Sequence, residues 1–234
     1  MPLFAYNNRY DYTVNMTSPQ NTENTPEEQA TPLAPVPYLT FGLIALLVAI
    51  YLLTSYPGFD HIQRFAVALG GFVPKSIGAG ITNTDYWRWV TGNLLHADPG
   101  HLLMNCFTLY IFGNLLEPAI GRGRFAGLIL MGMLGCDIST WVFSHNISIG
   151  ASGIAYSFIG FYFALLLTLT RKTAPQNFNQ SLRTIIFVVL LYTYMDISRG
   201  GVNIAGHLGG FAGGALYELL LVSITAARVP KQPE

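Results

Sequence analysis

A serine lies between small residues where an uncharged loop meets an apolar stretch, in the run Gly150-Ala151-Ser152-Gly153. A serine hydroxyl can attack a carbonyl carbon if a base takes its proton and hydrogen-bond donors stabilise the oxyanion that forms. A helix start suits this chemistry, because its first backbone N–H groups are unpaired and its dipole favours negative charge. Ser152 could equally be a helix cap, so it is a candidate nucleophile that needs a partner.

A histidine that could act as the base lies in a glycine-rich segment. His207 is the one ionisable residue of the run 203–210, and such residues inside membrane helices are rare and usually functional. Small residues at spacing four let two helix backbones approach closely in lipid, so packing of two such stripes would bring His207 beside Ser152. The alternative is that the glycines serve packing alone and His207 binds a carbonyl. The stripes are Gly206, Gly210 and Gly214 in one segment and Gly153, Ser157, Gly160 and Ala164 in the other.

Two further polar residues lie four positions apart, in His101-Leu102-Leu103-Met104-Asn105. Residues at this spacing share one helix face, so the side chains of His101 and Asn105 are expected to point the same way. Both can donate hydrogen bonds to an oxyanion during acyl transfer. As an alternative, His101 could be an interfacial residue and Asn105 could bond to another helix.

The composition indicates that these residues are held by helices in a membrane. Of the 234 residues, 51% are hydrophobic and only 10% are charged, whereas soluble domains carry about a quarter charged residues. Both cysteines fall in apolar runs and fit buried, inert thiols better than a metal site. A spanning helix needs about 20 mostly apolar residues. Six segments approach this criterion, namely 38–55, 101–120, 125–143, 152–170, 184–198 and 203–226.

The positive charges predict how the chain is oriented. With the N-terminus in the cytoplasm, eight Lys and Arg residues fall inside and four outside, so both termini are expected inside and the loop 144–151 outside. We expect a disordered cytoplasmic tail over 1–35, a six-helix domain over 36–227 and a short C-terminal tail over 228–234. Glu117 is expected to pair with Arg122 or Arg124 at the inner end of the second segment.

Taken together, these motifs resemble those of the rhomboid family of intramembrane proteases. The order and spacing of His101-x-x-x-Asn105, Gly150-Ala151-Ser152-Gly153 and Gly206-His207-x-x-Gly210 match that family over about 86–217. Gly206 departs from it slightly, since many members have alanine there. Further matches are Trp87-Arg88, His96, Glu117 before Gly121, and Tyr156 four residues after the serine.

The resemblance implies an all-α integral membrane bundle of six transmembrane helices and a serine endopeptidase with a Ser152–His207 dyad. His101, Asn105 and the Ser152 N–H would then stabilise the oxyanion, and Tyr156 would pack on the His207 ring. The implied substrates are single-pass transmembrane proteins, cut near the outer face of the inner cell membrane and in contact with its lipid. We expect no cofactor, metal or nucleic-acid partner.

Two other functions compete with this interpretation. A channel or transporter would place polar residues along a path through both membrane halves, whereas here they cluster towards the outer ends, apart from Asp137 and Asp196. A catalytically inactive, rhomboid-like protein that binds membrane clients is the nearer rival, and it would lack the serine or the histidine.

Overall fold

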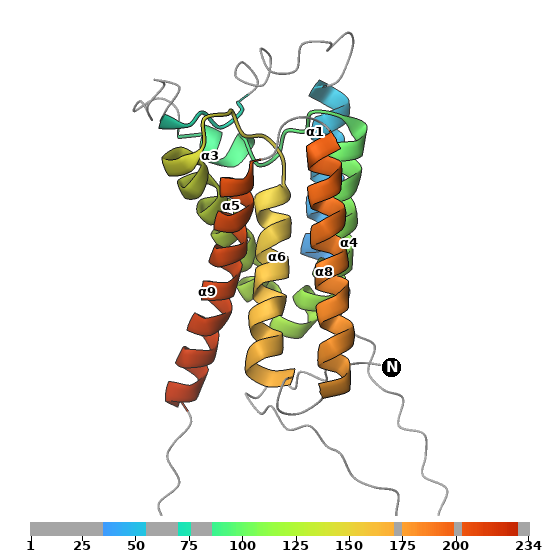
Figure 1. Ribbon diagram of the computed structural model, residues 1–234, viewed down its shortest axis with the longest axis vertical. Helices are drawn as coiled ribbons and strands as arrows, with labels where there is room; N and C mark the ends of the chain where they lie inside the picture. Colours follow the sequence, from blue (N-terminus) through green and yellow to red (C-terminus); the bar gives the residue numbers. More distant parts are fainter. Residues whose placement is uncertain (1–34, 55–69, 76–85, 171–174, 199–202, 229–234) are drawn as a thin grey trace, which may run out of the picture.

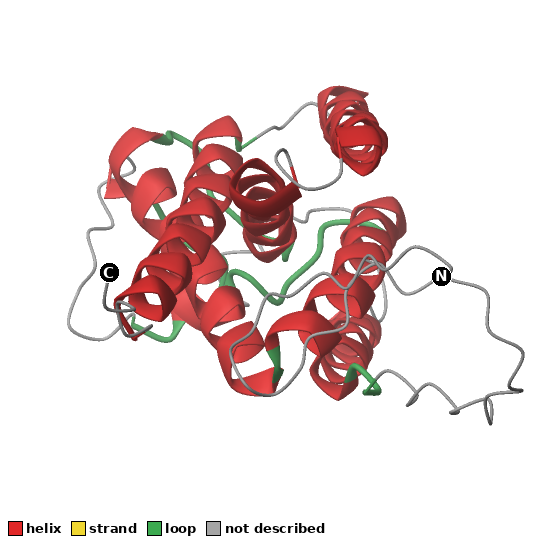
Figure 2. Cartoon of the chain, turned by 90° about the horizontal axis from the view of Figure 1, so that it is seen from below, coloured by secondary structure: helices red, strands yellow, loops and turns green. Residues whose placement is uncertain are grey.

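The computed structural model describes residues 35–54, 70–75, 86–170, 175–198 and 203–228. Within these residues the chain is helical apart from loops and one isolated bridge between Phe72 and Ser148, as Figures 1 and 2 show. The elements in chain order are α1 (Tyr38–Thr54), α3 (Arg88–Thr91), α4 (Pro99–Ile120), α5 (Arg122–Phe143), α6 (Ser152–Leu165), η2 (Leu166–Thr170), α8 (Pro175–Ser198) and α9 (Ile204–Arg228).

Each of the six segments expected from the sequence corresponds to a long helix, with two differences. The expected segment 152–170 is α-helical only to Leu165 and continues as the π-helical turns of η2. The expected segment 184–198 is too short, because α8 begins at Pro175. Proline is favoured in the first turn of a helix, and the residues that follow it are polar, so an apolar window misses the start of this helix. The expected tails 1–35 and 228–234 lie outside the described residues except for residue 35 and for Arg228, which is the last residue of α9.

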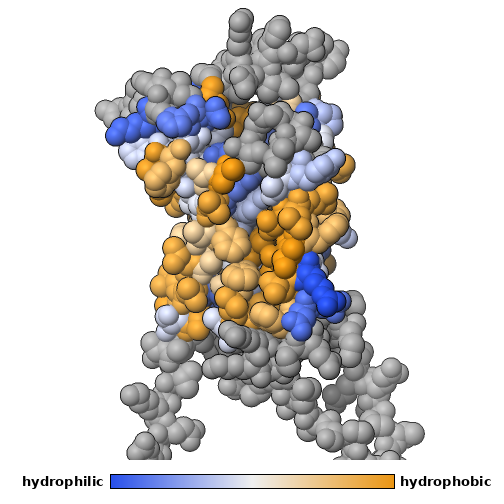
Figure 3. Space-filling view, viewed as in Figure 1, coloured by the Kyte–Doolittle hydropathy of each residue, from blue (hydrophilic) through white to orange (hydrophobic). Residues whose placement is uncertain are grey.

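The outer surface of the helices is apolar over the middle of the molecule. On the face drawn in Figure 3, hydrophobic side chains cover the middle, and hydrophilic ones gather near the end that carries α3 and in a smaller patch at the lower right. Two of the described helices, Arg122–Phe143 and Ile204–Ile224, are long and apolar enough to cross a membrane. The apolar helices Tyr38–Thr54 and Ser152–Thr168 are shorter. A belt of this kind suits contact with lipid. Strongly exposed hydrophobic side chains on these helices include Leu53, Leu103, Phe143, Phe187 and Leu208.

Helix α6 is the centre of the bundle. Twelve of its fourteen residues are buried, and it lies between α9 and α8 in the view of Figure 1. A helix that is apolar on all sides is buried on all sides. Because α6 begins with Ser152, this serine lies in the protein interior and not on the lipid-facing surface.

Small residues let α6 and α9 lie almost backbone to backbone. A Cβ atom on Gly210 would collide with the carbonyl oxygen of Gly153, and one on Gly214 would collide with that of Ser157. From the other side, a Cβ on Gly160 would meet the carbonyl oxygen of Phe211. The expected packing of the two small-residue stripes is thus confirmed.

Glu117 joins the end of α4 to the start of α1. Its carboxylate accepts hydrogen bonds from the backbone N–H groups of Leu39 and Thr40 at 2.9 and 2.8 Å, and from the Thr40 hydroxyl at 2.8 Å. The expected pairing of Glu117 with Arg122 or Arg124 is therefore wrong. A buried carboxylate is better satisfied by these unpaired first-turn N–H groups, which also carry the positive end of the helix dipole.

The loops at the α3 end are tied to one another by backbone hydrogen bonds. Phe72 and Ser148 exchange N–H···O bonds of 2.8 and 2.9 Å, and Gly150 N donates to Gly92 O at 2.9 Å. Arg88 donates from Nη1 to Gly71 O at 3.1 Å, and its guanidinium lies over the Trp87 ring. These bonds fix the approach of the chain to Ser152. Of the chain between α1 and α4, residues 55–69 and 76–85 lie outside the described residues.

Candidate active site

Ser152 and His207 form a direct pair across the α6–α9 contact. His207 Nε2 lies 3.0 Å from Ser152 Oγ, and both side chains are only 8% exposed. The cap of α6 is Ala151, with no side-chain capping bond, so Ser152 is the first residue of the helix. The alternative in which Ser152 caps the helix is therefore wrong. In the tautomer with the proton on Nδ1, the imidazole can accept the serine proton through Nε2.

Tyr156 stacks on the His207 ring. The two ring centroids are 4.4 Å apart with an interplanar angle of 12°, and Tyr156 lies one turn after Ser152 on the same face of α6. A parallel aromatic neighbour leaves the imidazole little freedom to rotate. Nucleophile, base and stacking ring are all carried by two helices that cannot easily move apart.

His101 and Asn105 lie together beside the turn that precedes Ser152, as their spacing predicts. Gly150 has φ of +117°, and a Cβ atom there would come within 2.6 Å of His101 Nε2 and 3.5 Å of Asn105 Nδ2. Only glycine adopts this conformation easily and leaves the space in front of the two side chains open.

The Asn105 amide carries a buried donor without a partner. Asn105 is fully buried, its Oδ1 accepts from Tyr192 Oη at 2.8 Å, and its Nδ2 has no hydrogen-bond partner. An interhelical bond was the alternative to an oxyanion role, and the structure contains that bond through Oδ1. An unpaired buried donor is costly, so the free Nδ2 on the Gly150 side is the feature that fits an acceptor supplied by a substrate.

His96 supports the same turn from the loop before α4. Its Nε2 is 3.5 Å from Ala151 N, an interaction at the limit of hydrogen bonding, and its ring packs edge-on against His101 at 5.1 Å. Burial, followed by the neighbouring His101, lowers the pKa of His96 to about 3. His96 is therefore neutral, as an acceptor of the Ala151 N–H must be.

Two polar residues of this site were not found from the sequence. Tyr192 of α8 contacts Asn105, Tyr156 and His207, yet no pattern distinguishes it from the other aromatic residues of that segment. Asn203 begins α9 by accepting from Gly206 N at 3.0 Å and donating to Thr140 and Ser148. An asparagine ahead of a helix is a capping signal that could have identified it.

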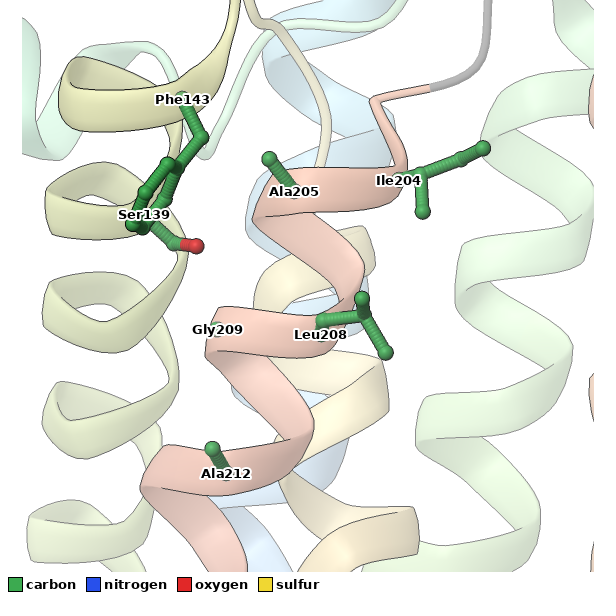
Figure 4. A pocket seen from close by; sticks show the side chains of 7 residues that line it. All are labelled: Ser139, Phe143, Ile204, Ala205, Leu208, Gly209 and Ala212. Carbon is green, nitrogen blue, oxygen red and sulfur yellow. The ribbon is translucent and has the colours of Figure 1, made fainter.

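A separate apolar pocket opens between α5 and α9 (Figure 4). None of Ser152, His207, His101 and Asn105 lines it. Its one side-chain polar group is the Ser139 hydroxyl, so it offers no chemistry comparable to that of the buried pair. It is lined by Ser139, Phe143, Ile204, Ala205, Leu208, Gly209 and Ala212.

A buried serine–histidine pair inside a helical bundle with an apolar belt has the makeup of a membrane-embedded serine hydrolase. The family comparison agrees with this class, since the rhomboid domain model matches residues 83–224. The chain belongs to the rhomboid family. Rhomboid proteins are integral membrane proteins, and most of the relatives of this chain are named as proteases.

Similarity to individual relatives extends over most of the chain. It is 28% identical to YdcA of Bacillus subtilis over 190 residues, which covers 80% of this chain and 89% of that protein. It is 30% identical to the rhomboid protease GluP of the same species, over 76% of this chain but only 34% of GluP. It is 22% identical to the rhomboid protease GlpG of Pectobacterium atrosepticum, over 76% of this chain and 60% of that protein.

Proposed function

We propose that the chain is an intramembrane serine endopeptidase with Ser152 as nucleophile and His207 as general base. The observation that carries the proposal is the 3.0 Å contact between His207 Nε2 and Ser152 Oγ at the buried start of α6. Serine and base at hydrogen-bond distance are the starting arrangement for acyl transfer. Membership of a family whose relatives are largely named as proteases supports the same conclusion.

The proposed reaction proceeds through an acyl-enzyme. Ser152 Oγ attacks the scissile carbonyl carbon while its proton passes to His207 Nε2, and the oxyanion is held by the Asn105 and His101 side chains and the Ser152 N–H. Collapse of this intermediate breaks the C–N bond, and His207 returns the proton to the leaving amine. In the second half of the reaction, His207 takes a proton from a water molecule, which attacks the ester carbonyl. The ester C–O bond then breaks, His207 returns the proton to Ser152 Oγ, and the second product leaves as a carboxylic acid.

The site's position in the bundle supports a substrate that is itself in the membrane. The pair lies near the end of the bundle that carries the tied loops, while the helices around it expose apolar side chains. We propose that six helices span the inner cell membrane, that both termini are cytoplasmic, and that single-pass transmembrane proteins are cut near the outer face. The domain then covers 36–227.

The test compares the purified chain in detergent with three variants on a single-span substrate and a fluorophosphonate probe. Ser152→Ala and His207→Ala are expected to remove cleavage, and Ser152→Ala also removes probe labelling. Ser157→Ala is the matched control, because this hydroxyl lies on α6 but bonds to the backbone oxygens of Leu128 and Ile154. It should keep labelling and cleavage.

The outcomes separate the protease from a client-binding protein without activity. Cleavage by purified Ser152→Ala at the wild-type rate contradicts the assignment of the nucleophile. A wild-type chain that binds the substrate but neither cleaves it nor reacts with the probe supports the inactive alternative instead.

A further inference from the structure

Tyr192 carries the one buried polar side chain of α8 over residues 178–194. The buried side chains of this stretch are Ile185, Val188 and Tyr192, the last being only 1% exposed. The neighbouring positions Leu190 and Tyr194 are 63% and 70% exposed. The Tyr192 hydroxyl is therefore the point at which α8 reaches the polar centre of the bundle.

The Tyr192 hydroxyl donates a hydrogen bond to the Asn105 amide, which is proposed to bind the oxyanion. Tyr192 Oη lies 2.8 Å from Asn105 Oδ1 and 3.2 Å from Met104 O, so the shorter contact is the one to the amide. The ring meets Tyr156 edge-on at 5.3 Å and His207 at 6.4 Å. One residue thus touches the amide, the stacking ring and the base.

An asparagine amide has a donor end and an acceptor end, and only the donor end can stabilise an oxyanion. With Oδ1 accepting from the tyrosine, Nδ2 is left on the side of Gly150 without a partner. If the amide rotated by half a turn, its oxygen would face the developing negative charge and repel it. The hydroxyl of Tyr192 favours the productive orientation because it donates its proton to Oδ1.

We infer that Tyr192 is a positioning residue, which holds the Asn105 amide in the orientation needed for the transition state. This inference rests on the proposed function. It predicts that Tyr192→Phe, which keeps the ring and its contacts with Tyr156 and His207, loses only the orienting bond. One net hydrogen bond corresponds to about a 3- to 10-fold change in rate. We therefore expect kcat to fall by that factor with KM unchanged, because the oxyanion exists only in the transition state.

The experiment measures kcat and KM for the wild type, Tyr192→Phe, Asn105→Ala and the double variant. The concentration of active sites in each sample is determined by complete reaction with fluorophosphonate, and kcat is calculated per active site. Tyr194→Phe is the matched control, because it removes a tyrosine hydroxyl from the exposed face of the same helix. If Tyr192 acts through Asn105, Tyr192→Phe has no further effect on kcat once Asn105 is alanine.

Several results would overturn the inference. The first is a Tyr192→Phe enzyme with wild-type kcat, and the second is a fall in kcat that is equal with and without Asn105. The third is an effect on KM alone. The fourth is a fall in rate that disappears when the rate is calculated per active site. Ser152→Ala, assayed beside them, tests the proposed function separately. If it still cleaves, the serine assignment fails, whereas a Ser152-dependent enzyme that is insensitive to Tyr192→Phe refutes the positioning role alone.

Discussion

Gly210 of α9 lies against Gly153 of α6, so close that a Cβ atom on Gly210 would overlap the carbonyl oxygen of Gly153. Gly153 directly follows Ser152, and Gly210 lies three residues after His207. The distance between nucleophile and base is therefore set by a contact in which neither partner has a side chain. Displacement of catalytic groups by about 1 Å can cost ~100-fold in rate.

We expect Gly210→Val to lose most activity and to lower the melting temperature, because the added side chain forces α6 and α9 apart. Gly42→Val is the control, since nothing lies within 4 Å of a Cβ at Gly42 in α1. Melting temperature and probe labelling are measured for both. His207→Ala should lose activity with a much smaller change in melting temperature. Near-normal activity and stability in Gly210→Val would show that the close approach is not required.

Much of this arrangement follows from local sequence patterns. The small-residue stripes predict the α6–α9 contact, and the four-residue spacings predict that His101 lies beside Asn105 and that Tyr156 shares a helix face with Ser152. These relationships depend on helix periodicity alone, so a single sequence contains them.

Contacts between distant segments were less accessible to prediction. Tyr192 reaches Asn105 across 87 positions of sequence, and its apolar segment offers no periodicity that fixes which face turns inward. Opposite charges close in sequence suggest an arginine partner for Glu117. The first turn of α1 instead supplies N–H donors that no charge pattern reveals.

Asn105→Ala should lower kcat by more than it raises KM. Removing one oxyanion donor typically raises the barrier by about 2.7–4 kcal/mol, or ~100- to 1,000-fold in kcat. Steady-state cleavage of a single-span substrate gives both constants. An increase in KM at unchanged kcat would mean that Asn105 contributes to ground-state binding, which is not the role proposed for it.

The neutral state of His96 predicts a pH dependence of stability. Its pKa is about 3 in the folded protein and near 6.5 when unfolded, so below pH 6.5 the unfolded chain binds the extra proton. The contribution of His96 to stability is complete above that pH and declines as the pH falls towards 3, by at most about 1.4 kcal/mol per unit. Denaturation in detergent between pH 7 and 4 should show a weaker dependence in His96→Gln. Equal slopes in both proteins would contradict a neutral His96.

The proposed orientation is tested by single cysteines at the two ends of α5. Asn146 lies exposed in the loop after α5, and Gly123 lies exposed at its start. With an impermeant maleimide on intact cells, we expect labelling of Asn146→Cys and no labelling of Gly123→Cys until the membrane is permeabilised. The unchanged protein controls for Cys106 and Cys136, which are half-buried and buried. The reverse pattern would place the candidate active site on the cytoplasmic side.

Removal of the Glu117 carboxylate should destabilise the bundle without altering the chemistry of the site. Glu117 is 2% exposed and accepts two N–H bonds and one hydroxyl bond from the first turn of α1. Glu117→Ala leaves buried donors unsatisfied, at about 1–3 kcal/mol each, so the melting temperature should fall by several degrees. Glu117→Gln keeps one acceptor oxygen and the volume of the side chain, so its melting temperature should fall by less. Since Glu117 lies at the opposite end of α4 from His101, kcat per titrated site should stay unchanged at temperatures where both variants are folded. A loss of kcat per site at full stability would mean that α1 takes part in positioning the candidate active site.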